Sequence, residues 1–157
     1  MSEEPALAID LDRVIGDTRP LWHAWLESAA PVLGLDPAAL PDDRAQAADE
    51  LDRSGAGNWR TLLERFSEDC APVYLRRDPA TSAALRALTG SGHRLGVFSD
   101  APEPLARVAL SHLGADRRVE LLETGAGACE RLLSQLGPDA VVVSRRAELE
   151  RVLRGGA

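Results

Sequence analysis

Short apolar runs alternate with amphipathic stretches along most of this chain. Four runs of apolar, partly β-branched residues, at 7–11, 95–98, 119–122 and 140–143, are predicted to be strands. Helical periodicity covers 80–88, 103–113 and 129–136, and Gly114 and Gly137 follow the last two stretches as typical helix stops. Strands and helices alternating at this spacing predict an α/β protein with a parallel sheet of about four strands.

The segment 19–77 interrupts this alternation. It contains three stretches with helical patterns, at 21–33, 37–48 and 58–70, and no convincing strand. Turn residues separate the stretches at Asp36-Pro37 and at 54–57. We therefore expect a core domain formed by 1–18 and 78–157, with a helical cap subdomain at 19–77. Trp22, Trp25 and Trp59 are expected to form the core of that insert.

Composition narrows the classes of function. At 157 residues with 45% apolar content, the chain can bury a core of its own. A net charge of -7 argues against nucleic-acid binding. The start of the chain is acidic and no apolar run approaches a membrane span, so we expect a cytoplasmic protein without membrane contact. All 18 basic residues are arginine, which excludes any mechanism that needs a lysine.

The first predicted strand ends in two carboxylates, Asp10 and Asp12, separated by Leu11. Residues i and i+2 of a strand point to the same side, so the two acids are expected to stand together. Ligands of open α/β proteins bind at the carboxyl ends of the strands. Asp10 and Asp12 are therefore the leading candidates for chemistry.

The motif Asp10-Leu11-Asp12 and the later run 95–102, which ends a strand in Ser99 and Asp100, resemble two motifs of the haloacid dehalogenase (HAD) superfamily. The likeness is to its small phosphatases with a helical cap inserted after the first motif. It implies a HAD-like Rossmannoid sheet, Asp10 as nucleophile and Asp12 as general acid and base. It also implies that Ser99 and Asp100 bind the phosphoryl group, and that Asp10 and Asp12 bind Mg²⁺.

Two later motifs depart from the family pattern. No lysine stands near 123–128, where the family has one, and Ser144, Arg145 and Arg146 stand where the family has a metal-binding acid. One reading places Arg145 or Arg146 in the metal's position, gripping the phosphate bidentately. The other reading leaves both arginines solvated at a helix start. The Mg²⁺ site implied by the resemblance thus lacks its fourth-motif acid.

Two functions follow from these observations. The first is hydrolysis of a small phosphorylated metabolite through an aspartyl-phosphate, at a low rate because compensating charges are missing. The alternative is a catalytically impaired relative that binds a phosphorylated ligand or a protein partner without turnover. The early end of the chain after the fourth strand also leaves an edge strand at which a homodimer or a protein partner can pair.

Overall fold

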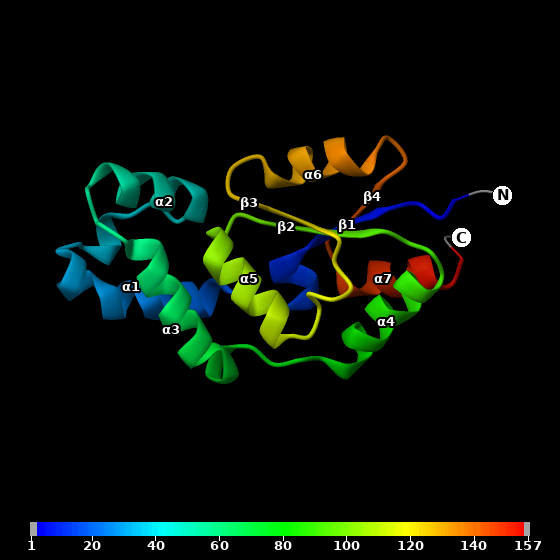
Figure 1. The fold of residues 1–157 in the computed structure, drawn as a ribbon, viewed down its shortest axis with the longest axis horizontal. Coiled ribbons are helices and arrows are strands. Elements are labelled where there is room, and N and C mark those ends of the chain that lie inside the picture. Colours follow the sequence, from blue (N-terminus) through cyan, green and yellow to red (C-terminus); the bar gives the residue numbers. More distant parts are fainter. Residues whose placement is uncertain (1–2, 156–157) are drawn as a thin grey trace.

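The computed structural model describes residues 3–155 and contains one parallel sheet of four strands (Figure 1). These are β1 (Leu7–Asp10), β2 (Leu95–Ser99), β3 (Leu121–Thr124) and β4 (Val141–Val143), in the order β3-β2-β1-β4. The register pairs Asp10 with Phe98. Strands β1 and β2 therefore end side by side at the middle of the sheet. The expected α/β class and strand number are confirmed.

Helices cover both faces of this sheet (Figure 1). Helix α6 (Ala128–Leu136) lies on one face, where Leu132 packs with Ala6 and Ala8. Helices α4 (Pro79–Gly90), α5 (Glu103–His112) and α7 (Arg146–Leu153) lie on the other, over Leu7 and Ile9. The two faces of β1 thus carry side chains of different size, with Ala6 and Ala8 toward α6 and Leu7 and Ile9 toward the other helices.

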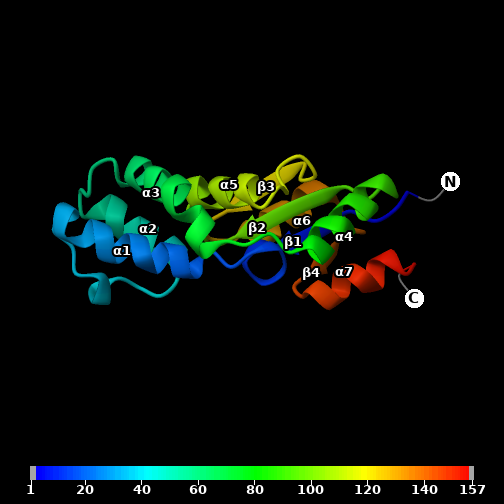
Figure 2. The same cartoon turned by 90° about the horizontal axis from the view of Figure 1, so that it is seen from below.

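Three helices, α1 (Arg19–Leu33), α2 (Arg44–Arg53) and α3 (Trp59–Tyr74), lie together at one end of the molecule (Figures 1 and 2). Trp22, Trp25 and Trp59 are almost fully buried there, and Trp25 contacts both other rings at centroid distances of 5.3 and 6.0 Å. Their core is continuous with the side chains above β1. The expected boundary between a cap at 19–77 and a separate core domain stays a prediction.

One predicted helix was misplaced. The stretch 37–48 contains a short 3-10 turn at Pro37–Ala39, and α2 begins only at Arg44. Pro41 lacks the N–H that a continuous helix would need, and the Asp43 side chain accepts a hydrogen bond from the N–H of Gln46. Asp43 thus sets the start of α2, and Arg44 becomes its first residue.

The strand that carries Asp10 is also shorter than predicted. β1 ends at Asp10, and Leu11–Ile15 form a single π-helical turn that the Asp10 side chain caps. Asp12 therefore lies on a turn, and the argument from strand alternation does not apply to it. Among the described residues, no helix is long and apolar enough to cross a membrane.

Candidate functional site

Asp10 stands at the carboxyl end of the central strand β1. Its Oδ1 accepts hydrogen bonds from the backbone N–H groups of Asp12 (3.1 Å) and Arg13 (3.3 Å). Within residues 3–155, the only charged partner of its Oδ2 is the guanidinium of Arg13, at 3.9 Å. Burial raises the pKa of Asp10, the charge of Asp12 adds to this, and the contacts from Arg13 oppose it. One carboxylate oxygen is thus anchored while the other is left without a close partner.

Asp12 is saturated with hydrogen-bond donors. Its Oδ1 accepts from the N–H and the hydroxyl of Thr18, at 2.9 and 2.5 Å. Its Oδ2 accepts from the Ser99 hydroxyl and from Nη2 of Arg44, both at 2.8 Å. A protonated carboxyl would have to give up one of these contacts, because each of them is donated to Asp12.

Arg44 is the cation at the centre of this arrangement. It comes from the first turn of α2, and its side chain is only 2% exposed. Besides Asp12, Nη2 contacts Asp100 Oδ1 at 2.7 Å, and Nη1 donates to the Thr18 hydroxyl at 2.6 Å. Its Nε is buried and has no partner within the described residues. The guanidinium thus joins the helical insert to the ends of β1 and β2.

Asp100 completes the pairing from the residue that follows β2. The backbone N–H of Arg44 donates to its Oδ2 at 3.2 Å, so both carboxylate oxygens contact the same residue. Burial alone would raise the pKa of Asp100, but the hydrogen bonds and charge of Arg44 outweigh it, and the pKa is lowered. Arg44 therefore holds Asp100 in its ionised form.

An open hollow of about 480 Å³ lies over these carboxylates, between the sheet edge and the insert. Charged side chains dominate its lining: Asp10, Asp12, Asp42, Asp43 and Asp100 face Arg13, Arg19 and Arg44, with His23 beside them. Acids outnumber bases there, so an anionic ligand would need the arginines to turn toward it.

The structure brings together some of the predicted site residues and separates others. Asp10, Asp12 and Asp100 line the hollow, while Ser99 is buried beneath it and donates to Asp12. Arg145 is 82% exposed, with Glu148 nearby at 4.0 Å. Arg146 donates to the Val14 carbonyl at 2.9 Å and lies 3.6 Å from Asp78. Neither arginine lines the hollow.

Comparison with solved structures finds chains of similar architecture, among them the following three. CbbY from Rhodobacter sphaeroides, solved in complex with phosphate, matches with a TM-score of 0.65 and 15% identity, over 90% of this chain and 77% of its own. A putative β-phosphoglucomutase from Thermotoga maritima matches with a TM-score of 0.57 and 15% identity, over 96% and 82%. A haloacid dehalogenase-like hydrolase from Streptococcus pneumoniae matches with a TM-score of 0.57 and 17% identity, over 90% and 76%.

The chain has a HAD-like fold. This confirms the fold expected from the motifs around Asp10 and Ser99. No protein-family model matches the sequence, and a search of curated proteins finds no significant match. At these identities the likeness establishes the fold, and the chemistry has to be argued from the side chains.

The donor set of this site does not fit a divalent cation in the arrangement described. Asp12 and Asp100 face one another across the Arg44 guanidinium, which takes the space between them. No group of three histidine, cysteine, aspartate or glutamate side chains suited to a metal occurs within residues 3–155. The segment after β4 has Ser144, Arg145 and Arg146 where the family pattern has a metal-binding acid. The N–H of Ser144 donates to Glu148, and among the described residues of this segment no carboxylate lines the hollow.

Sequence reasoning missed Arg44. It lies 32 residues from Asp12 and 56 from Asp100, so no local spacing connects them. The absence of lysine was a signal, because adjacent carboxylates favour a nearby cation and arginine is the only side chain in this sequence with a permanent positive charge. That argument leaves 18 candidates, and only the start of α2 at Arg44 selects one.

Proposed function

We propose that this protein is a HAD-type phosphohydrolase that acts on the phosphate ester of a small metabolite, with Asp10 as the nucleophile. The observation that supports this most is the position of Asp10. It ends the central strand, its Oδ1 is anchored by two backbone N–H groups, and its Oδ2 lacks a close partner beside the hollow. An anchored carboxylate with one available oxygen is what an attack on phosphorus requires.

In the proposed reaction, Asp10 Oδ2 forms a bond to phosphorus while the bond from phosphorus to the ester oxygen breaks. The leaving oxygen takes a proton from Asp12. Water then attacks the aspartyl-phosphate, Asp12 takes a proton from it, and phosphate leaves with Asp10 regenerated. Both steps need Asp12 beside the nucleophile, and the two side chains line the same hollow.

Arg44 supplies the positive charge for this site in our proposal. Phosphoryl oxygens compete with Asp12 and Asp100 for its N–H groups, and its buried Nε has a free donor. A guanidinium suits this role because its fork of donors matches phosphate oxygens. The exchange has to break contacts to two carboxylates, so we expect slow turnover.

A second candidate function rests on the four donors that surround Asp12. With Arg44, Ser99 and Thr18 in place, Asp12 is held as an acceptor and does not act as an acid. The protein would then bind a phosphorylated ligand without hydrolysing it. An effect of Mg²⁺ would not by itself distinguish hydrolysis from binding without hydrolysis, so turnover and binding have to be measured separately.

The test is phosphate release from a panel of phosphorylated metabolites, with and without Mg²⁺, by the native protein and by Asp10→Asn. Asp139→Asn is the matched control, because Asp139 is an exposed aspartate that does not line the hollow. We expect release that Asp10→Asn abolishes and Asp139→Asn preserves. Equal release by the native protein and Asp10→Asn would overturn the hydrolase.

Binding of inorganic phosphate by the same proteins tests the second candidate. Absent turnover combined with saturable binding that Arg44→Met removes would establish binding without hydrolysis. Absence of both turnover and Arg44-dependent binding would exclude both functions.

A further inference from the structure

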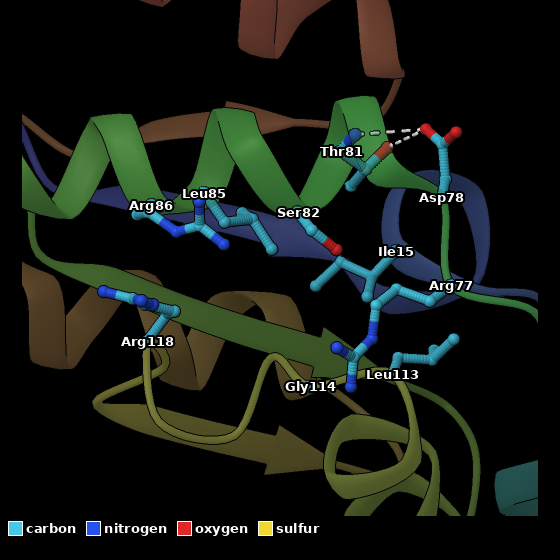
Figure 3. A pocket seen from close by; sticks show the side chains of 10 residues that line it. All are labelled: Ile15, Arg77, Asp78, Thr81, Ser82, Leu85, Arg86, Leu113, Gly114 and Arg118. Carbon is cyan, nitrogen blue, oxygen red and sulfur yellow. Dashed lines mark hydrogen bonds between the residues drawn. The ribbon is translucent and has the colours of Figure 1, made fainter.

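A second pocket lies away from Asp10, between α4 and the turn that follows α5 (Figure 3). It is small, about 60 Å³, and three arginines line it: Arg77, Arg86 and Arg118. They come from three separate segments, namely the connection from α3 to α4, helix α4, and the loop before β3. The Ser82 hydroxyl points into the same space (Figure 3).

None of these three guanidiniums has a carboxylate partner within residues 3–155, whereas 11 of the 18 arginines do. The one acid in the lining, Asp78, is already engaged by the N–H and hydroxyl of Thr81 at 3.1 and 2.6 Å. Thr81 is neutral and leaves the charge of Asp78 in place, so three guanidiniums and one carboxylate give this lining a net charge of +2 in a chain of net charge -7. An anion bound there would reduce the repulsion among the three guanidiniums.

The guanidinium of Arg77 lies close to the backbone at Gly114. Gly114 ends the turn after α5 with φ of +71°, and a Cβ there would lie 2.4 Å from Nη2 of Arg77 and 2.5 Å from its Cζ. A side chain at this position would therefore collide with the guanidinium. Ile15, from the π-helical turn after Asp10, supplies part of the apolar lining, while the three arginines are exposed to solvent.

We propose that this pocket is an anion site for a single phosphoryl group. Three guanidinium forks and a hydroxyl offer more donors than the two oxygens of a carboxylate can accept, whereas the oxygens of a phosphoryl group suit them. At about 60 Å³ the pocket holds the phosphoryl group only, and the remainder of a larger ligand lies in solvent. The bound group would contact both the segment leading out of the insert and the turn that carries Asp12.

NMR of the full chain, titrated with inorganic phosphate, tests this site. We expect saturable shifts of the Ser82 and Gly114 amides, while binding at the first site shifts the amides of Asp12 and Arg13. Arg86→Gln/Arg118→Gln should weaken the Ser82 and Gly114 response about tenfold, since it removes two of three charge-assisted contacts.

The matched control is Arg65→Gln/Arg151→Gln. It makes the same change in net charge at two exposed arginines on α3 and α7 that have no ion pair within residues 3–155. We expect it to leave the affinity unchanged. Equal weakening by both double variants would show nonspecific charge attraction, and absent saturation at Ser82 and Gly114 in the native protein would remove the site. Neither outcome depends on whether Asp10 hydrolyses a phosphoester.

Discussion

At the scale of single residues, the Arg44 guanidinium governs the candidate site. It is almost fully buried and contacts two carboxylates and two hydroxyls, those of Asp12, Asp100, Thr18 and Ser99. A buried charge is tolerated only when it is paired, so removal of one partner leaves the other uncompensated. Arg44 thus carries both the local charge balance and part of the contact between insert and sheet.

Substitution of Arg44 by methionine is expected to lower the free energy of unfolding by about 3 kcal/mol, the loss typical of a broken buried ion pair. Urea denaturation followed by circular dichroism measures this. Arg94→Met is the control, because Arg94 pairs with Glu120 where both side chains are half exposed, and it should shift the midpoint very little. In the double variant Arg44→Met/Asp12→Asn, part of the stability should return. A double variant less stable than Arg44→Met would contradict this account.

Asp10 and Asp100 are expected to make stability depend on pH in opposite directions. The lowered pKa of Asp100 stabilises the fold above its ordinary value of 3.8, and this contribution is lost as pH falls through the folded value. The raised pKa of Asp10 stabilises the fold below 3.8, and this contribution is lost as pH rises through the folded value.

These directions can be separated with the variants Asp10→Asn and Asp100→Asn. Free energies of unfolding are measured for each variant and for the native protein between acid and neutral pH. As pH rises, the native protein should gain stability relative to Asp100→Asn and lose it relative to Asp10→Asn. A loss relative to Asp100→Asn as pH rises would show that Arg44 does not lower the pKa of Asp100, and a gain relative to Asp10→Asn would show that burial does not raise the pKa of Asp10.

At the scale of elements, the close packing of α6 on the sheet depends on one glycine. A Cβ at Gly96 of β2 would lie 2.6 Å from Cδ1 of Leu132, which is fully buried in α6. The absence of a side chain at Gly96 therefore allows the helix to approach the strand.

Gly96→Ala is expected to destabilise the protein by roughly 1 to 3 kcal/mol through overpacking, and Leu132→Ala by roughly 2 to 5 kcal/mol through the cavity it leaves. Because the new methyl group occupies space that Leu132 vacates, the double variant should lose less than the sum of the two. Chemical denaturation of all four proteins completes the cycle. Additive losses would show that Leu132 moves aside and that the two positions are uncoupled.

At the scale of the whole molecule, the helical insert and the sheet share one hydrophobic cluster. Trp22, Trp25 and Trp59 belong to the same connected set of buried side chains as Ile9 of β1 and Leu105 of α5. Helix α3 packs directly on α5, so the contact extends beyond Arg44. A continuous core predicts that the parts unfold together.

The three tryptophans allow a direct test, since all of them lie within 19–77. Tryptophan fluorescence therefore reports on the insert, while far-ultraviolet circular dichroism reports on the entire chain. We expect the two denaturation curves to coincide. A fluorescence transition at lower denaturant concentration would show that 19–77 unfolds on its own, as the predicted domain boundary implies.

The sequence alone determined the class of fold. Apolar runs of strand length, separated by helices with clear stops at Gly114 and Gly137, specify a parallel sheet, because these signals are local. Asp10 and Asp12 are two residues apart, so their closeness required no tertiary information. The homodimer or protein partner expected at an exposed sheet edge stays a prediction.

Only the tertiary structure decided which cation faces these acids. Arg145 and Arg146 follow a strand in the expected place, yet their side chains turn to Glu148, Val14 and Asp78. Arg44 reaches Asp12 because Pro41 and Asp43 delay the start of α2 and the insert packs against the carboxyl ends of β1 and β2. Pairing between charges far apart in the chain depends on how whole elements pack, and this packing cannot be predicted from the residues next to an arginine in the sequence.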